Sequence, residues 1–326
     1  MKLLFVGDVM LGRLVNQALK KEPSNYPWGD TLPLFKKADL RFCNLESVIS
    51  DRGQPWSATP KVFHFRSDAK NIEVLKAAQI NAVSLANNHV LDFEYEAMFE
   101  MLKLLSDVKI AFAGAGATFT AASKPTFLKA NQQKVGLVAF TDNEPQWEAA
   151  DLIPGIFYLP PQRKDRRAQQ LAEIIRLAKK ESEILIISAH WGPNWGYAPP
   201  AEHSSFAHFL IDRGADIIFG HSAHVFRGIE IYRNKVILYS TGNFIDDYAV
   251  DEIERNDQSF IFIIETKNKQ IAKIELYPTI IENFQAKLAV GDEAEDIALK
   301  MQTLTAELGT PLEWQEKERQ LTLSLL

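Results

Sequence analysis

The sequence has little cysteine, no long apolar run and no cluster of basic residues. Cys43 is the only cysteine, so no disulfide can form within the chain and no cluster of thiolates can hold a metal ion. It stands in an apolar run, where a lone cysteine is most often a core residue. Because no apolar run reaches about 18 residues, we expect no membrane-spanning helix.

Charge and length narrow the class of protein further. The net charge is −6, and both signs are spread along the 326 residues. Without a basic block to neutralise phosphates, a nucleic-acid partner is not expected. The N-terminal run MKLLFV is too short for the apolar part of a secretory signal. We therefore expect a cytoplasmic protein whose core belongs to one α/β domain or two modest ones.

Short apolar runs alternate with helical periods. The runs are typical of strands buried on both faces and lie at Leu3–Val6, Leu40–Cys43, Ala82–Leu85, Ile184–Ser188 and Asp216–Phe219. The helical periods lie at Arg13–Lys20, Lys70–Ala78, Tyr95–Leu105, Arg166–Lys180 and Ser204–Asp212. This alternation predicts a parallel sheet covered by helices.

Other segments predict antiparallel pairs and loops. Hairpins are expected at Thr126–Ala130 with Val135–Phe140, at Val225–Tyr232 with Val236–Tyr239, and at Ser259–Thr266 with Gln270–Tyr277. The remaining predictions are surface loops at Ser50–Pro60 and Pro145–Asp165, a helix at Asp292–Leu308 and an edge strand at Gln320–Leu326. A mixed or double sheet is therefore expected. Since no flexible linker is visible, we expect one domain over residues 1–326.

Polar side chains follow all five predicted parallel strands. In chain order they are Asp8, then Asn44 and Glu46, then Asn87, Asn88 and His89, then His190, and finally His221 and His224. The carboxyl ends of such strands meet at one edge, which is where α/β sheets bind ligands. Any one of these residues alone has a structural explanation, such as a helix cap for Asp8 or a turn for Asn87 and Asn88. Their coincidence favours a common site.

These donors predict a metal centre. Carboxylate, amide and imidazole ligands without thiolate suit Mn²⁺, Zn²⁺, Fe or Co. The number of ligands indicates one ion, or two ions about 3.5–4 Å apart that acidify water and polarise a phosphoryl or carbonyl group. Asp92 stands three residues after His89 and is a candidate to orient its ring.

The motifs resemble one known family. They are GDVMLGR (7–13), NLES (44–47), SLANNHVLD (84–92), HWG (190–192), LIDRGADIIFGHSAHVFRGIEIY (210–232) and ILYSTGNF (237–244). Together they resemble the poly-γ-glutamate synthesis proteins CapA and PgsA, within the calcineurin-like metallophosphoesterases. The resemblance implies a four-layer αββα sandwich with a motif-bearing core at 1–245 and C-terminal strands and a helix at 257–326.

The resemblance also implies roles for individual residues. It implies Asp8 and His224 as ligands of a first ion, Glu46 as a bridging ligand, and Asn88, His190 and His221 as ligands of a second ion. His89 would contact the substrate and protonate a leaving group, with Asp92 beside it. Arg13, Asn87 and Arg227 would bind an anionic substrate, either a small molecule or a polymer.

This chain departs from the phosphoesterase pattern. Met10 stands where those enzymes carry a histidine, Glu46 replaces an aspartate, and Pro193-Asn194 follows HWG where many relatives have an acidic residue. Two functions remain open from the residues and the resemblance. One is a metal-dependent hydrolase of a phosphoester or a γ-glutamyl amide. The other is a non-catalytic accessory or binding protein in polyglutamate or capsule synthesis and export. A purely structural α/β protein would require the strand-end coincidence to be accidental.

Overall fold

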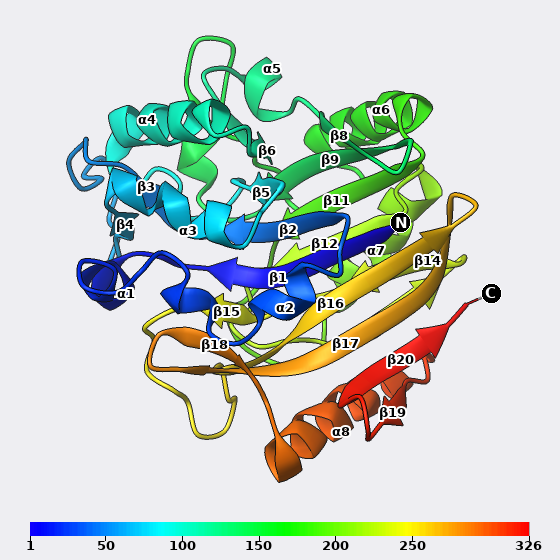
Figure 1. The fold of residues 1–326 in the computed structure, drawn as a ribbon. Coiled ribbons are helices and arrows are strands. Elements are labelled where there is room, and N and C mark those ends of the chain that lie inside the picture. Colours follow the sequence, from blue (N-terminus) through cyan, green and yellow to red (C-terminus); the bar gives the residue numbers. More distant parts are fainter. Residues whose placement is uncertain (326) are drawn as a thin grey trace.

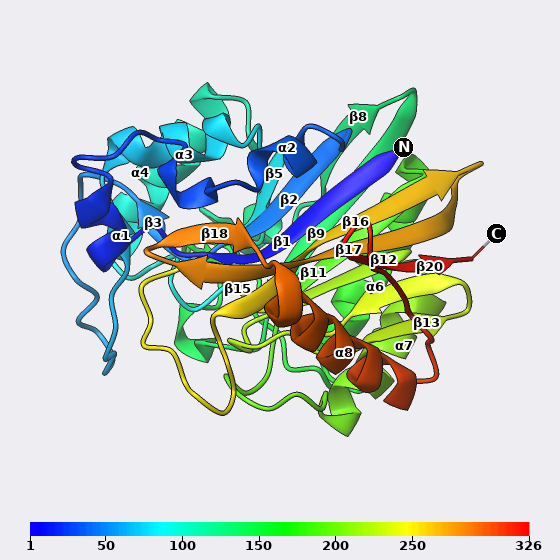
Figure 2. The same ribbon diagram turned by 60° about the horizontal axis from the view of Figure 1, so that its bottom comes forward.

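Two β-sheets face each other, and helices cover the outer face of each. The structure is a computed structural model that describes residues 1–325. Figure 1 shows the N-terminal strands and the C-terminal strands side by side in one sheet, with the second sheet behind them. Turning the molecule brings helix α8 (Gly291–Glu307) to the front, beneath the C-terminal strands (Figure 2).

The larger sheet joins both ends of the chain. Within residues 1–325 its strand order is β19-β20-β17-β16-β1-β2-β5-β6, with β15 beside β1 and β18 beside β17. The bounds are β1 (Lys2–Val9), β2 (Leu40–Leu45), β5 (Ala82–Ser84), β6 (Ala111–Ala113), β15 (Asn243–Ile245), β16 (Gln258–Lys267), β17 (Gln270–Glu282), β18 (Gln285–Leu288), β19 (Glu313–Gln315) and β20 (Gln320–Ser324). Strands β1, β2, β5 and β6 are parallel, whereas β16 runs antiparallel to β1.

The smaller sheet has the order β13-β14-β12-β11-β9-β8. Its strands are β8 (Thr126–Ala130), β9 (Gln133–Thr141), β11 (Ile184–His190), β12 (Ile217–His221), β13 (Ile229–Tyr232) and β14 (Lys235–Leu238). The central four are parallel, and β8 and β13 close the edges as hairpin partners. Two short pairs lie outside both sheets, β3 (Val48–Ile49) with β4 (Arg66–Ser67) and β7 (Ala115–Gly116) with β10 (Gly155–Ile156).

Side-chain alternation along the strands builds three cores. Leu3 and Phe5 of β1 point between the sheets with Ile186 of β11, whereas Leu4 packs on the outer helices. The outer face of the larger sheet is covered by α1 (Arg13–Ala18), α2 (Leu32–Phe35), α3 (Ile72–Ala77) and α4 (Glu94–Asp107). The outer face of the smaller sheet is covered by α6 (Arg166–Glu181) and α7 (Ala201–Asp212). The short α5 spans Phe119–Ala122, and 3₁₀ turns lie at Tyr26–Trp28, Ala69–Asn71 and Pro145–Trp147.

The predicted fold class is confirmed, because helices enclose two stacked sheets in four layers. The predicted parallel strands, hairpins and helices are present, with small shifts at their ends. Cys43 is a buried free thiol in the core, as predicted. Among residues 1–325, no helix combines the length and the apolarity needed to cross a membrane.

Two predictions were wrong in detail. The segment 145–165 is not a surface loop, because Trp147, Phe157 and Leu159 are buried in the core between short elements. Strand β20 forms, but it is not an edge strand, since the three-residue β19 pairs with its free side. Leu326, the last residue of the predicted strand, lies outside the described residues.

Candidate metal centre and adjoining pocket

The carboxyl ends of the central strands bring the predicted residues together. In the larger sheet, Asp8 of β1 lies in register with Asn44 of β2 on one side and with Asn243 of β15 on the other. Gly7 makes the close packing of β15 possible, since a Cβ there would lie 1.9 Å from the Gly242 carbonyl oxygen. In the smaller sheet, His190 of β11 is in register with His221 of β12. Both sheets therefore deliver polar side chains to the same edge.

Asp8, His190 and His221 form the centre of the cluster. All three are buried, and each offers one ligand atom such that these atoms lie within 4.8 Å of one another. The Nδ1 atoms of His190 and His221 are 2.8 Å apart. Nε2 of His221 lies 2.7 Å from Ser188 Oγ, a partner that can fix the ring.

The carboxylates of the cluster are not satisfied by the protein. Asp8 Oδ1 accepts a hydrogen bond from Asn44 Nδ2 at 2.8 Å, and the backbone N–H of Ser222 faces the same carboxyl group. Ser222 has a φ of 98°, a strained value of the kind found at functional sites. Asp8 Oδ2 and Glu46 Oε2 are buried and have no hydrogen-bond partner in the described part of the chain. Such groups cost free energy unless something else binds them.

Burial sets the protonation of these groups. It raises the pKa of Asp8 to about 7, and burial together with the nearby Asp8 charge raises the pKa of Glu46 well above its usual range. Burial also lowers the pKa of His221 to about 3, and it lowers the pKa of His190, with help from His221. The imidazoles are therefore neutral, which is the state that binds metal ions.

A divalent cation fits this arrangement. Without a metal ion, the Nδ1 atom of either His190 or His221 has to be protonated and donate to the other. A bound cation would instead use the lone pairs of both atoms. The 2.8 Å between the two Nδ1 atoms suits two neighbouring ligands bound at about 2.1 Å. Nε2 of the neutral His190 ring then keeps its hydrogen and donates it to Asn88 Oδ1 at 2.9 Å. The unpartnered carboxylate oxygens and neutral imidazoles are the donor set expected for Mn²⁺, Zn²⁺ or Fe.

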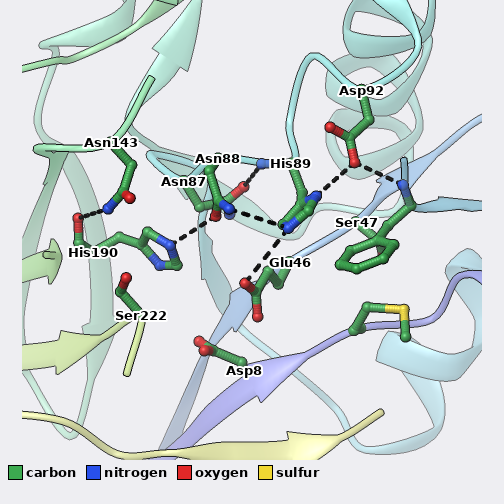
Figure 3. A network of polar contacts seen from close by, with 12 residues as sticks. Asp8, Glu46, Ser47, Asn87, Asn88, His89, Asp92, Asn143, His190 and Ser222 are labelled. Atoms are coloured by element: carbon green, nitrogen blue, oxygen red, sulfur yellow. Dashed lines mark hydrogen bonds and ion pairs between the residues drawn. The ribbon is translucent and has the colours of Figure 1, made fainter. Parts of the chain in front are cut away.

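A histidine–aspartate pair stands beside the cluster. His89 Nδ1 lies 2.6 Å from Asp92 Oδ2, and this carboxylate assigns the ring hydrogen to Nδ1. Nε2 then points toward Asn88 Nδ2 at 3.2 Å and Glu46 Oε1 at 3.9 Å (Figure 3). The Phe65 ring stacks on His89 with centroids 4.0 Å apart. His89 is thus held with the lone pair of Nε2 directed at Asn88 Nδ2, next to the cluster.

Lys61 packs against the His89–Asp92 pair and contacts Asp92. Its ammonium lies 3.3 Å from Asp92 Oδ1 and 3.1 Å from Glu144 Oε1, and it donates to the Asn88 carbonyl oxygen at 2.6 Å. The side chain is nearly buried and sits over the Trp147 ring. Lys61 therefore supplies the positive charge that an ionised Asp92 needs in this buried place.

A pocket of about 590 Å³ opens in front of the cluster. His89, His224 and Asn88 line its floor, and Arg13, Lys61 and Trp195 line its walls. Arg13 is paired with Asp247 at 2.8 Å and lies against the Phe63, Phe65 and Tyr248 rings. His224 Nδ1 bonds Asn243 Oδ1 at 3.1 Å, which leaves Nε2 for another partner. The pocket thus combines two side-chain cations, aromatic walls, and Asn88 and His224 of the candidate metal site.

Comparison with known proteins places this arrangement in a family. The sequence matches the bacterial capsule synthesis proteins called PGA_cap over residues 2–248. The chain belongs to the PGA_cap family. This confirms the resemblance indicated by the motifs, and the matched stretch contains every residue of the cluster.

Three individual proteins are similar in sequence to this PGA_cap chain. It is 32% identical over 283 residues to a probable polyglutamine synthesis accessory protein of Mycobacterium tuberculosis, covering 75% of this chain and 74% of that one. It is 26% identical over 325 residues to the PGA biosynthesis protein CapA of Bacillus subtilis, covering 98% and 81%. The capsule biosynthesis protein CapA of Bacillus anthracis is 24% identical over 322 residues, covering 98% and 76%.

Solved structures share the fold. A novel phosphatase from Mycoplasma pneumoniae has a TM-score of 0.54 at 16% identity, covering 86% of this chain and 93% of that one. A hypothetical protein from Thermus thermophilus has a TM-score of 0.51 at 14% identity, covering 85% and 98%. At these identities the likeness concerns the fold, which is of the metallophosphoesterase type.

Two residues predicted to bind substrate have other partners in this PGA_cap chain. Arg227 is fully buried, and its guanidinium donates to the carbonyl oxygens of Pro193, Trp195 and Gly196 at 2.9–3.3 Å. It fixes the loop that carries Trp195 and does not line the pocket. Asn87 is also fully buried, and its amide bonds Asn44, the Leu45 carbonyl and the His89 N–H. It holds the turn that presents His89. Both predictions placed a structural residue in the substrate site.

Several site residues were not predicted. Lys61 comes from an irregular loop, and Asn243 lies on the short strand β15, whereas Asn44 was expected at the strand ends but was given no role. The only signal for Lys61 is a lone lysine between apolar residues of a loop, which is too common to be informative. Asn243 stands in the motif ILYSTGNF, and its amide position in register with Asp8 requires the sheet to be known.

Proposed function

We propose that this PGA_cap protein is a metal-dependent hydrolase that cleaves a phosphoester or a γ-glutamyl amide bond of an anionic substrate in polyglutamate or capsule metabolism. The observation that carries the proposal is the position of His89. His89 lines the pocket, and its Nε2 lies 3.9 Å from Glu46 Oε1, at the edge of a cluster that suits a cation. A metal centre and a proton-transfer group therefore border the same cavity.

Each group of residues in the site would have its own role in the reaction. One or two divalent ions, when bound, would acidify water and polarise the scissile group. Their ligands would be Asp8, Glu46, Asn88, His190, His221 and His224. His89 would accept or deliver a proton at Nε2, within reach of a bound substrate. Asp92 would keep the hydrogen on Nδ1 and stabilise the ring when it becomes protonated. The Phe65 ring prevents His89 from turning away.

The walls of the pocket favour an anionic substrate. Arg13 and Lys61 both line it, but the ammonium of Lys61 is already paired with Asp92 and Glu144, so Arg13, whose side chain is about a third exposed, is the more accessible cation. Cationic side chains at a partly dry surface attract phosphate or carboxylate groups. The names of the relatives, which refer to PGA biosynthesis and to capsule biosynthesis, agree with a polyanion or its fragments as substrate.

The proposal is tested by turnover in the presence of metal. Protein loaded with Mn²⁺ or Zn²⁺ is incubated with panels of phosphoesters and γ-glutamyl amides, alongside His89→Ala. His208→Ala is the matched control, because His208 lies on α7 and bonds Glu230 away from the pocket. We expect His89→Ala to lose about 10²–10⁴-fold in kcat and the control to keep it. Absence of turnover on every panel, or equal turnover of both variants, contradicts the proposal.

A second candidate is an accessory protein that binds the polymer without cleaving it. Met10 favours this candidate, because its thioether is fully buried where phosphoesterases place a histidine ligand. The mycobacterial relative is itself named an accessory protein. Binding of polyglutamate that survives both chelation and Asp8→Asn would support this function, and lack of any affinity for polyglutamate would remove it.

A further inference from the structure

Strand β15 places Asp246 next to the position where the chain lacks a histidine. This strand pairs in parallel with β1, so that Val9 is in register with Ile245, and the Met10 N–H donates to the Ile245 carbonyl oxygen at 2.8 Å. Asp246 therefore leaves β15 at the level where Met10 leaves β1. The two residues stand side by side at the end of the strands that deliver Asp8.

Met10 cannot serve the cluster itself. Its side chain is fully buried, and its sulfur accepts a hydrogen bond from the Gly12 N–H at 3.0 Å. A thioether is also a soft ligand, which Mn²⁺ and other hard cations bind poorly. A donor for the first ion has to come from another residue near this position.

Asp246 has the properties that such a donor requires. Its side chain is 4% exposed, and Oδ1 accepts a hydrogen bond from the Tyr248 N–H at 2.9 Å. Oδ2 is buried and has no partner within residues 1–325. Asp246 also lies close enough to Asp8 and Glu46 for their charges to interact. Each of these three carboxyl groups contains one buried oxygen without a hydrogen bond.

Within residues 1–325, these three carboxyl groups form no ion pair with a lysine or an arginine. The charge of Arg13 acts on Asp246 from a distance, while its guanidinium pairs with Asp247. Buried acidic groups without a partner are destabilising and repel one another, unless they coordinate a metal ion. In the protein without metal, the only group within residues 1–325 whose ligand atoms lie within 4.8 Å of one another is Asp8, His190 and His221, so Asp246 would have to approach the ion. The unpartnered Oδ2 of Asp246, on a side chain that is only 4% exposed, is the second observation that points to a ligand.

We propose that Asp246 is a carboxylate ligand of the first ion, bound together with Asp8, Glu46 and His224, and that it replaces the histidine absent at position 10. This inference rests on the proposed metal-dependent function. It makes the first ion's site richer in oxygen than a site with two histidines, and therefore more favourable to Mn²⁺ than to Zn²⁺. The second ion keeps its imidazole ligands His190 and His221.

Asp246→Asn tests the assignment without changing the shape of the side chain. Protein stripped with chelator is dialysed against Mn²⁺, and the bound metal is counted by elemental analysis. We expect two equivalents in the wild type, and in the variant either the loss of one equivalent or at least a tenfold rise in one Kd. Because Asn resembles a protonated Asp, the variant without metal should melt at the same temperature as the wild type or higher.

Two further variants make the test specific. Asp257→Asn is the matched control, because Asp246 and Asp257 both line a neighbouring cavity of about 220 Å³, while Asp257 pairs with Arg255 away from the cluster. It should keep both equivalents. Met10→His combined with Asp246→Asn should regain the lost equivalent, since the imidazole returns a donor to the same place.

The outcomes separate the two proposals. A wild type that binds no Mn²⁺ at all overturns this inference together with the proposed function. If the wild type binds Mn²⁺ and Asp246→Asn binds the same number of ions with the same Kd, only the role of Asp246 is wrong. Equal losses in Asp246→Asn and Asp257→Asn would also overturn it, because the effect would then belong to the shared cavity.

Discussion

Two aspartates at opposite ends of the parallel strands are equally buried and differ in their partners. Asp216 precedes β12, and Asp8 lies near the end of β1; each is 1% exposed. Asp216 pairs with the ammonium groups of Lys179 and Lys235 and accepts the Leu185 N–H at 2.8 Å. Asp8 faces the Asn44 amide and other acidic groups, and its Oδ2 has no partner within residues 1–325.

We interpret this difference as that between a structural carboxylate, Asp216, and a candidate metal ligand, Asp8. A buried charge is tolerated when cations and N–H groups surround it, and removing those partners is strongly destabilising. Asp216 receives its partners from the chain and ties α6 to the smaller sheet. Asp8 receives too few, so the protein retains an acidic group whose partner has to come from outside. The contrast leads to four predictions.

The largest effect is expected from Asp8→Asn. Without this ligand, turnover by the metal-loaded protein should fall at least about 10³-fold, which corresponds to roughly 4 kcal/mol of transition-state stabilisation. Folding should not suffer, because an unpartnered acidic group has been replaced by a neutral one. Kinetics with Mn²⁺ and melting in chelator check both parts. Retained turnover, or a chelated variant that melts well below the wild type, would count against the assignment of Asp8.

The stability difference between Asp8→Asn and the wild type should depend on pH in chelator. Burial raises the pKa of Asp8 from 3.8 in the unfolded chain to about 7 in the fold, so between these values the folded wild type binds the extra proton. Its contribution is therefore fully present below pH 4 and is lost as the pH rises through 7. Between about pH 4 and pH 7, the free energy of unfolding of Asp8→Asn should therefore rise relative to that of the wild type. Equal denaturation midpoints at pH 4.5 and pH 8 would show that Asp8 is not held in this environment.

Asp216→Ala should have the opposite pattern and a somewhat smaller effect. Removing this carboxylate leaves Lys179 and Lys235 without their partner, and we expect a loss of about 3 kcal/mol in the free energy of unfolding. Stabilisation by added Mn²⁺, about 2.7 kcal/mol at a hundredfold excess over Kd, should be unchanged. Denaturant titrations with and without metal measure both quantities. If Asp216→Ala were no longer stabilised by Mn²⁺, Asp216 would also be linked to metal binding, and the distinction between the two aspartates would be wrong.

Lys61→Met should have the smallest effect, because Lys61 acts on His89 only through Asp92. Without the ammonium, Asp92 is a poorer acceptor for His89 Nδ1, and we expect kcat to fall about tenfold, or roughly 1.4 kcal/mol. Metal content should not change, and Lys61→Arg should restore part of the activity. The pH profile of kcat is the informative readout, since a purely structural role for Lys61 would leave its shape unaltered.

The sequence predicted the features that depend on periodicity and chain order. Buried strands followed by polar residues predicted which side chains meet, because parallel strands share one edge. Partners that come from irregular or short segments were not predictable, as Lys61 and Asp246 illustrate. Arg227 was predicted to bind an anionic substrate because of its positive charge. Nothing in the sequence indicates that its guanidinium is buried against loop carbonyl groups. Burial and hydrogen-bond partners depend on tertiary packing, which periodicity and residue order along the chain do not reveal.

Anomalous X-ray scattering from crystals grown with Mn²⁺ tests the central claim most directly. We expect an anomalous peak at the ends of β1, β11 and β12, with Asp8, His190 or His221 atoms about 2.1 Å away. Well-ordered crystals at saturating Mn²⁺ that give no peak there, or a peak only at an unrelated surface position, would contradict it.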